Sequence, residues 1–396
     1  MLRTVLLTLM LVFTNMAGCL SEKPTQSQFE WPDRVETPCE IRNSEDALAC
    51  TEYLSGFETP ILSKQHPSEP EIWIVDLSGK IVSWDGEIKR NVANLSGIIS
   101  NCHNEQGLLG MEFTDDFETS NEILVSYVEN GTCEGENKSD LILATAVVVD
   151  GAVSANSIQI LREIDQPYRN HNGGHLLAVG NNQYLWGVGD GGYHNDPQGH
   201  GQNASTPLGA IHLFEYQNGT MQPVVERTDG GDQYVLHHGL RNPWRFDLDV
   251  ENRLWLTDVG QYCWEEINLF SIDEPGNFGW NTREGKHELG AGGCDSESSE
   301  PGEGLIDPIH EYGHQDGNCS ITGGFWMDWG PSILLDGYLF GDFCSGSIWS
   351  LEQAGDSWNS EYIGTTGVMI VGFGKGLDDE LLIFSWTGTI YQLSDV

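Results

Sequence analysis

Six weak repeats constrain the fold of this chain more than any other feature of its sequence. Each repeat ends in a short apolar segment after a turn, and these segments are 79–84, 143–148, 209–214, 265–270, 346–351 and 388–393. Most of them follow another apolar run, at 72–75, 123–128, 184–188, 254–256, 338–340 and 381–384. No long stretch has helical periodicity, and 48 glycines punctuate the short strands. Six such units predict an all-β, six-bladed β-propeller, although two all-β sandwiches fit the same pattern.

A propeller would bring together loops that are far apart in the sequence. Loops from successive blades converge on the mouth of the central channel, where a ligand pocket is expected. The loops that we place there are 105–107, 170–171, 189–193, 239–242, 260–261 and 322–325.

The first 19 residues predict an export signal. Arg3 precedes the apolar run 5–13, which is too short to span a membrane, and the segment ends in small residues followed by Cys19. This ending resembles the lipobox of prokaryotic lipoproteins, so we expect a lipid on Cys19 as the membrane attachment. The predicted parts are a signal peptide at 1–19, a polar tether and N-terminal segment at 20–55, and the propeller at 56–396. The protein would be periplasmic or on the cell surface.

The remaining cysteines and the charge agree with export. Eight cysteines are left after Cys19, and an even number in an exported chain predicts disulfides. Proximity suggests the pairs Cys39–Cys50 and Cys102–Cys133. With 18 basic and 60 acidic residues, the net charge of −42 repels nucleic acid and anionic membranes. This negative charge is compatible with calcium binding or a salty environment. The small number of basic residues leaves few cationic partners for an anionic cofactor.

The stretch 169–192 contains the first candidate site. Two apolar runs, 176–179 and 184–188, flank a Gly-Asn-Asn-Gln turn and predict a β-hairpin. His171 would lie at one mouth of this hairpin, and the loop Gly189-Asp190-Gly191-Gly192 returns to the same end. Glycines on both sides would let a flat ligand approach closely. A surface histidine beside ordinary turn glycines explains the stretch equally well.

Two later stretches add polar groups. Arg241 offers a fork of donors suited to carboxylates or quinone oxygens, unless it pairs with a surface acid. The glycine turn at 258–261 exposes carbonyls of the kind that Ca²⁺ binds, and Asp258 and Glu266 could add charge. A tight turn with acidic flanks is the simpler interpretation of this second stretch.

Two histidine pairs are weaker candidates. His310 and His314 have the i, i+4 spacing of a zinc site on a helix, but Pro308 and Gly313 argue against a helix there. The pair 237–238 is better explained by packing.

Taken together, these stretches resemble the glucose/sorbosone dehydrogenase family, from about residue 70 to 393 and in the family's order. This family includes soluble aldose dehydrogenases that depend on pyrroloquinoline quinone (PQQ) and proteins like Hedgehog-interacting protein. The segments 308–312, 320–324 and 339–346 are similar to the second branch. The motifs that carry the resemblance are Gly107-Leu108-Leu109-Gly110-Met111-Glu112-Phe113, His171-Asn172-Gly173-Gly174, Gly189-Asp190-Gly191-Gly192, Gly239-Leu240-Arg241-Asn242-Pro243-Trp244, Asp258-Val259-Gly260-Gln261 with Glu265-Glu266-Ile267-Asn268, and Gly279-Trp280.

The resemblance implies a quinoprotein dehydrogenase that oxidises aldose sugars at the anomeric carbon to lactones. His171 would be the general base for the C1 hydroxyl, while PQQ takes the hydride. Arg241 would stabilise charge on the quinone. The implied residues for PQQ are Gln106, His171, Arg241, Asn242, Gly260 and Gln261, and those for Ca²⁺ are Gly260, Gln261 and Glu266.

The chain departs from the family at several basic positions. His175 stands where the family usually has arginine, and the last blade, at 387–392, lacks the arginines of some quinone binders. Because PQQ carries three carboxylates, Arg169, Arg245 or Lys375 would have to substitute. A non-catalytic propeller that binds glycan or protein, and a Ca²⁺-dependent lactonase-type hydrolase, are the alternatives. The sequence specifies neither the sugar nor the electron acceptor.

Overall fold

A computed structural model describes residues 31–42, 48–225, 230–290 and 293–396. The chain separates into two units, 1–32 and 33–396, and every strand described lies in the second. The predicted signal peptide at 1–19 and the lipidation site Cys19 lie outside the described residues. Within these residues the α-helix α1 (Phe117–Ser120) spans only one turn, and no helix is long and apolar enough to cross a membrane.

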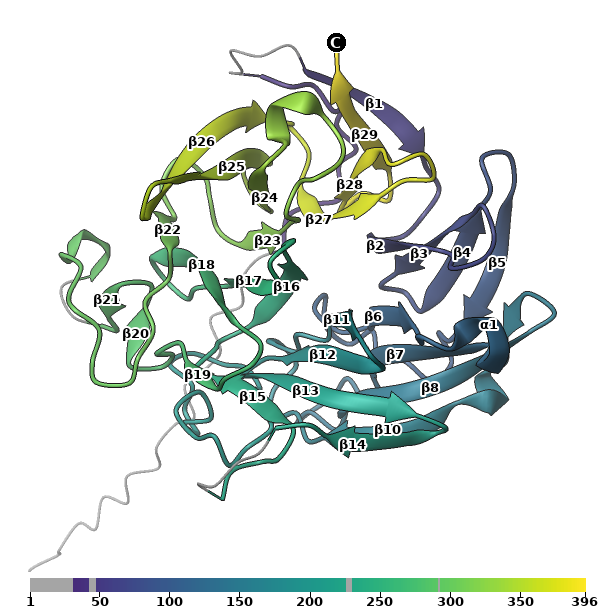
Figure 1. The fold of residues 1–396 in the computed structure, drawn as a ribbon, viewed down its shortest axis with the longest axis horizontal. Helices are drawn as coiled ribbons and strands as arrows, with labels where there is room; N and C mark the ends of the chain where they lie inside the picture. The colour runs from purple at the N-terminus through teal and green to yellow at the C-terminus, as the bar shows by residue number, and fades with distance from the viewer. Residues whose placement is uncertain (1–30, 43–47, 226–229, 291–292) are drawn as a thin grey trace, which may run out of the picture. The chain divides into compact units, whose positions relative to one another are not determined.

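The second unit is a six-bladed β-propeller, which confirms the predicted all-β class (Figure 1). Each blade is a mainly antiparallel sheet of at least four strands. In ring order the blades are β2 (Pro60–Gln65), β3 (Ile72–Asp76), β4 (Lys80–Trp84) and β5 (Lys89–Asn94); β6 (Leu108–Phe113), β7 (Glu122–Val128), β8 (Leu141–Val149) and β10 (Gln159–Ile164), with β9 (Ala152–Val153); β11 (Leu176–Gly180), β12 (Gln183–Val188), β13 (Ala210–Gln217), β15 (Val235–His238) and β19 (Gly276–Asn277), with β14 (Thr220–Pro223); β16 (Pro243–Leu248), β17 (Arg253–Asp258), β18 (Trp264–Ser271) and β22 (His310–Gly313); β23 (Ile321–Gly323), β24 (Gly337–Asp342), β25 (Ser347–Ala354) and β26 (Ser357–Thr365); and β27 (Ile370–Lys375), β28 (Leu381–Ser385), β29 (Ile390–Asp395) and β1 (Leu48–Leu54).

The repeats in the sequence correspond to the two middle strands of each blade. The six repeated segments are β4, β8, β13, β18, β25 and β29, and the runs before them are β3, β7, β12, β17, β24 and β28. Middle strands are covered by neighbouring blades on both faces, so their side chains are largely buried and apolar. This burial is why these twelve segments could be recognised.

The sixth blade is closed by a strand from the other end of the chain. β1 pairs antiparallel with β29, from Leu48 opposite Asp395 to Leu54 opposite Ile390. β1 is an outer strand with an exposed middle, so its sequence lacks a clear apolar run. The propeller therefore begins inside the segment 20–55, before the boundary predicted at 56.

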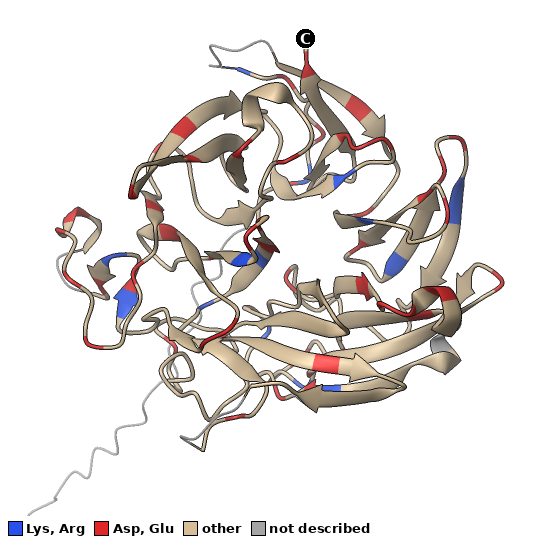
Figure 2. Cartoon of the chain, viewed as in Figure 1, with Lys and Arg blue, Asp and Glu red and all other residues tan. Residues whose placement is uncertain are grey.

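The innermost strands β2, β6, β11, β16, β23 and β27 surround the centre of the ring (Figure 1). Neighbouring innermost strands run in the same direction; for example, the glycines at 372 and 374 of β27 lie against Ile61 and Ser63 of β2. The loops that precede these strands consequently meet at one end of the channel. Figure 2 shows both basic and acidic segments near the centre of the ring and at its periphery, and the acidic segments are spread over many of the peripheral loops.

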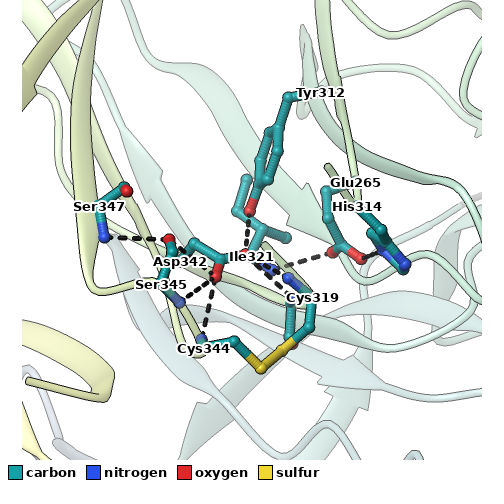
Figure 3. The surroundings of a disulfide bond; sticks show 10 residues. Glu265, Tyr312, His314, Cys319, Ile321, Asp342, Cys344, Ser345 and Ser347 are labelled. Carbon is teal, nitrogen blue, oxygen red and sulfur yellow. Dashed lines mark hydrogen bonds and ion pairs between the residues drawn. A yellow bond between two sulfur atoms is a disulfide. The ribbon is translucent and has the colours of Figure 1, made fainter. Parts of the chain in front are cut away.

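All eight cysteines after Cys19 form disulfides, including both predicted pairs. The bonds are Cys39–Cys50, Cys102–Cys133, Cys263–Cys294 and Cys319–Cys344. Four disulfides indicate an oxidising environment, as expected for an exported protein. The buried carboxylate of Asp342 organises the last bond: it accepts the amides of both Cys319 and Cys344 at 3.0 Å and the Tyr312 hydroxyl at 2.9 Å (Figure 3).

Candidate active site

The imidazole of His171 is oriented by a buried carboxylate. Its Nδ1 lies 2.7 Å from Oδ1 of Asp190, and both side chains are buried. An ionised carboxylate only accepts hydrogen bonds, so Nδ1 carries the proton and Nε2 keeps its lone pair. The amide of Gly192 and Nε1 of Trp280 donate to the same carboxylate, each at 2.8 Å. The sequence marked the Gly189–Gly192 loop, but it did not show that Asp190 orients the imidazole.

The loop before β6 holds the backbone at His171. His171 has φ of 57°, and its amide donates to Oε2 of Glu105 at 2.7 Å. Nδ2 of Asn172 donates to the carbonyl of Glu105 at 3.2 Å. The next residue, Gln106, is buried; its Oε1 accepts from Ser100 at 2.8 Å, and its Nε2 has no partner among the described residues. Gln106 thus has an unused donor and directly follows the residue that contacts the His171 loop.

The glycines around His171 serve the packing of the protein itself. A Cβ atom on Gly189 would lie 2.0 Å from the carbonyl oxygen of His171, and one on Gly174 would lie 2.3 Å from Cβ of Leu109. At these two positions the missing Cβ lets protein segments approach each other closely. Close approach by a flat ligand stays a prediction. The predicted hairpin itself is confirmed as β11 and β12.

Arg241 and Asn242 lie in a loop beside the loops of His171 and Asp190. Their amides donate to the two carboxylate oxygens of Asp258, at 2.7 and 2.6 Å. The Arg241 guanidinium lies 5.6 Å from the ring centre of Trp280, and its Nη1 donates to the carbonyl of Val259 at 3.0 Å. Its Nε is buried and has no partner among the described residues.

Two hydrogen bonds join the Arg241 loop directly to the His171 loops. The Asp190 amide donates to the Arg241 carbonyl at 2.8 Å, and the Gly173 amide donates to Oδ1 of Asn242 at 3.0 Å. The structure therefore brings together the loops of three residues predicted for the site, His171, Arg241 and Asn242, and the loop that carries Gln106 contacts them through Glu105.

The turn after β17 presents two backbone carbonyls. The amides of Gln261 and Tyr262 both donate to Oε1 of the buried Glu284 at 2.6 Å, and the amides of 263 and 264 point to the same oxygen. Within a trans peptide the C=O is opposite to the following N–H, so the carbonyls of Gly260 and Gln261 face away from Glu284. Neither carbonyl accepts a hydrogen bond from the described residues. Such oxygens suit a hard cation such as Ca²⁺.

Glu266 is occupied within its blade. It lies opposite Asp258 in register, and its oxygens accept from Nδ2 of Asn268 at 2.9 Å and from the amide of Gly285 at 3.0 Å. Burial and the charge of Asp258 raise the pKa of Glu266 well above its ordinary value, and burial raises the pKa of Asp258 to about 7. Two adjacent buried carboxylates ionise together only at high cost. Glu266 therefore belongs to the hydrogen-bonded support of the turn.

Two other basic residues considered for the cofactor have side-chain partners within the protein. Arg169 donates to the carbonyls of Thr132, Gly135 and Glu136. Lys375 is the last residue of β27 and pairs with Asp379 at 2.9 Å. His171 and Arg241 precede their innermost strands, whereas Lys375 ends one, so it lies toward the opposite end of the channel.

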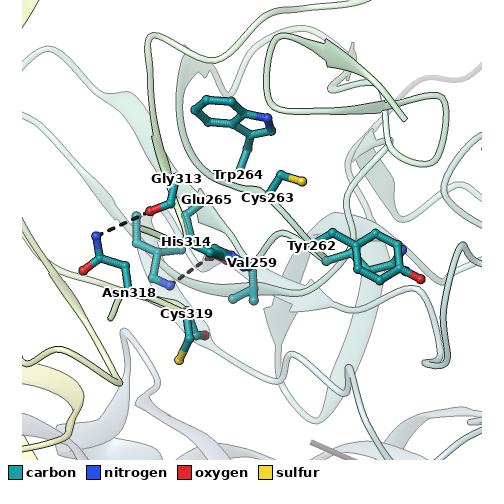
Figure 4. Close-up of polar contacts among 12 residues, drawn as sticks. Val259, Tyr262, Cys263, Trp264, Glu265, Gly313, His314, Asn318 and Cys319 are labelled. Atoms are coloured by element: carbon teal, nitrogen blue, oxygen red, sulfur yellow. Dashed lines mark hydrogen bonds and ion pairs between the residues drawn. The ribbon is translucent and has the colours of Figure 1, made fainter. Parts of the chain in front are cut away.

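The two histidines at 310 and 314 lie in separate environments. His310 packs on the ring of Phe340, whereas Nε2 of His314 lies 2.6 Å from Oε1 of the buried Glu265 (Figure 4). The segment between them is the strand β22, so the helical spacing of a zinc site does not arise. The His314 amide also donates to the Cys263 carbonyl at 3.1 Å, so this pair supports the turn that carries Gln261.

Sequence comparison relates the chain to known proteins. The sequence profile of the Glucose / Sorbosone dehydrogenase family matches residues 58–332 of the 396. The HIPL2 protein of Arabidopsis thaliana is 27% identical over 234 residues, which make up 52% of this chain and 33% of that protein. The chain thus spans about a third of the length of this curated relative.

Solved structures share the fold at low identity. The apo-form of the soluble aldose sugar dehydrogenase from Escherichia coli has a TM-score of 0.73 and 20% identity, covering 88% of this chain and 100% of that one. The PQQ-bound aldose sugar dehydrogenase from Streptomyces coelicolor has a TM-score of 0.67 and 18% identity, covering 88% and 99%. The family match extends through the first four blades and their site loops. The chain belongs to the glucose/sorbosone dehydrogenase family.

Proposed function

We propose that this protein is a PQQ- and Ca²⁺-dependent dehydrogenase that oxidises aldose sugars at the anomeric carbon to lactones. The observation that carries the proposal is the 2.7 Å contact between His171 and Asp190, which leaves Nε2 of His171 as a base next to Arg241. Membership of the glucose/sorbosone dehydrogenase family supports the same reaction.

The proton transfer belongs to His171. Its Nε2 takes the proton of the C1 hydroxyl, and the Asp190 carboxylate stabilises the imidazolium that forms. Trp280 and Gly192 keep Asp190 in place through their hydrogen bonds. Bound PQQ would supply the two-electron acceptor for the hydride of C1.

The residues present fit an anionic quinone and a hard cation. Nε2 of Gln106 and Nε of Arg241 are buried donors without partners among the described residues, and they would hold the quinone together with Asn242. The carbonyls of Gly260 and Gln261 would bind Ca²⁺, and Glu266, which was also predicted as a ligand, would support this turn through its hydrogen bonds within the blade. Arg241 would stabilise negative charge that develops on the quinone oxygen.

The test is sugar-dependent reduction of an artificial electron acceptor by the purified chain after loading with PQQ and Ca²⁺. Wild type should turn over aldoses, and His171→Ala should abolish turnover while still taking up PQQ. His66→Gln is the control, because His66 follows β2 at the other end of the channel. Absence of activity with all aldoses despite bound PQQ would contradict the proposal.

A second candidate is a non-catalytic propeller that binds glycan or protein. The similarity to HIPL2 and the missing arginines of the last blade favour it. Absorbance titration with PQQ, with and without Ca²⁺, separates the two candidates. A folded protein that takes up no PQQ but retains a glycan or protein ligand would establish the second.

We also propose that the mature protein is exported and anchored by a lipid on Cys19, at the periplasmic face or cell surface. The lipobox-like ending of the signal and the four disulfides support this location. Mass spectrometry of the mature N-terminus should find an acylated Cys19, and Cys19→Ser should release the protein from membranes.

A further inference from the structure

A cavity of about 170 Å³ lies in the channel, toward the end opposite His171. Its lining includes Lys64 of β2, Arg245 of β16 and Lys375 of β27, and it contains no aspartate or glutamate. Three of the chain's 18 basic residues thus share one small cavity in a protein with 60 acidic residues. The volume is below the roughly 300–1,000 Å³ of pockets for larger organic ligands, so an occupant must be small.

Arg245 is a buried cation without a carboxylate partner. The residue is 6% exposed, and no acidic group lies within 4.0 Å of its guanidinium among the described residues. Nη1 donates to the carbonyl of Trp244 at 2.8 Å and Nη2 to that of Ile61 at 3.4 Å, while Nε has no partner in the described part of the chain. Burial lowers the pKa of Arg245 to about 9, so the group is still charged at neutral pH. A buried charge of this kind is costly unless an ion of opposite sign accompanies it.

The two lysines extend the positive lining, and each pairs with an acid that is not part of the lining. Lys64 pairs with Glu112 at 2.5 Å, and Lys375 pairs with the largely exposed Asp379 at 2.9 Å. Neither acid lines the cavity. Asp247 is also nearby in sequence, but it is outside the lining and accepts the amide of Trp326 at 3.0 Å. Among the three cations of this cavity, Arg245 is therefore the one without a carboxylate partner among the described residues.

His175 adds an acceptor to the same cavity. Its Nε2 lies 3.2 Å from the carbonyl of Phe246, so Nε2 carries the proton and Nδ1 keeps a lone pair. Nδ1 is buried and has no partner among the described residues. Burial and the charges of Arg245 and Lys64 lower the pKa of His175 well below its ordinary value, so the ring is neutral. A matching ligand would carry negative oxygens for the cations and one O–H group for His175.

We propose that the channel cavity binds a small inorganic oxyanion with a hydroxyl group, hydrogenphosphate, between Arg245, Lys64, Lys375 and His175. Phosphate oxygens would accept from the guanidinium and the lysines, and the P–OH would donate to Nδ1 of His175. The ion would also neutralise the buried charge of Arg245. This site is separate from the proposed sugar site and does not depend on it.

The test is calorimetric and thermal-shift titration of the full chain with sodium phosphate at pH 7 and constant ionic strength. Phosphate should bind saturably and raise Tm, and sulfate should bind more weakly because it has the same shape but no O–H group. Lys375→Gln should weaken phosphate binding roughly fivefold, whereas Lys89→Gln, on the outer strand β5, should not change it. Arg245→Met should abolish it.

Several outcomes would overturn the proposal. Equal binding of sulfate and phosphate would refute hydrogenphosphate as the ligand, and unchanged binding by both Arg245→Met and Lys375→Gln would refute the site. If Arg245→Met does not fold, crystals grown with arsenate, a heavier analogue of phosphate, decide the question by anomalous scattering. A peak beside Arg245 supports the site, and its absence at saturating arsenate overturns it.

Discussion

Nε2 of His314 lies 2.6 Å from Oε1 of Glu265, and the glutamate side chain is completely buried. Burial lowers the pKa of His314, but the hydrogen bond and charge of Glu265 outweigh this effect and raise it above its ordinary value. A group whose pKa is raised on folding stabilises the protein below its unfolded pKa and loses that contribution as pH rises through the folded pKa.

The pair therefore predicts a pH dependence of stability. The free energy of unfolding should fall as pH rises from about 6.5, the unfolded histidine pKa, through the raised pKa of His314. His314→Gln should reduce this slope, because the glutamine has no proton to lose. Urea unfolding at a series of pH values measures it, with His66→Gln as control. Parallel profiles for wild type and His314→Gln would contradict the prediction.

Asp190→Asn should inactivate the proposed enzyme while preserving the fold. The amide can donate to Nδ1 of His171, which would move the ring proton to Nε2 and remove the base. We expect kcat to fall by about 10³-fold or more, with a smaller change in KM. Steady-state kinetics of acceptor reduction measure both constants, and Asp85→Asn, in an outer turn of the first blade, is the control. A kcat close to that of wild type would show that Asp190 does not set the tautomer.

Glu284→Ala should weaken the proposed Ca²⁺ site. Four amides of the turn 261–264 would lose their common acceptor, and the carbonyls of Gly260 and Gln261 would lose their fixed direction. Removing such a supporting group typically lowers metal affinity about 10–100-fold. Calcium titration of the PQQ-loaded protein measures the change. Glu288→Ala, an exposed residue on the strand β21 (His287–Glu288) that pairs with β20 (Arg283–Glu284), is the matched control and should leave the affinity unchanged.

Gly189→Ala should displace the His171 loop. The added Cβ would lie 2.0 Å from the His171 carbonyl oxygen, so one of the two loops must move. We expect destabilisation by about 2 kcal/mol or more and loss of activity in the folded fraction. Thermal unfolding and kinetics test this, with Gly97→Ala as control because a Cβ there meets nothing within 4 Å. A fully active and stable Gly189→Ala protein would show that the loops can adjust.

The fold was largely predictable because each blade has two middle strands buried on both faces. The hairpin at β11 and β12 was equally clear, since Asn181 and Asn182 adopt the positive φ angles that a tight turn requires. β1 was not predicted, because this outer strand lacks a continuous apolar run. Its pairing with β29, more than 300 residues away, leaves no local signal.

The site was predictable only in part. Family motifs identified His171, Arg241 and Asn242, and the structure joins their loops through hydrogen bonds. Glu284 comes from a separate two-stranded ribbon, and no spacing in the sequence relates it to the turn that it supports. Lys375 was predicted as a cofactor ligand because of its charge. The end of the channel at which it lies depends on the direction of β27, and composition does not reveal that direction.

The pairing of β1 with β29 also affects the order in which the blades can be completed during folding. Leu48 leaves the ribosome early, yet its partner Asp395 is translated more than 300 residues later, so the outer strand of the sixth blade must wait unpaired for nearly the whole of translation or export. Once the N-terminal segment reaches an oxidising compartment, the Cys39–Cys50 bond can form before β29 is available, because its two cysteines are only 11 residues apart. The ring would thus close last, when β1 pairs with β29 of the newly completed blade.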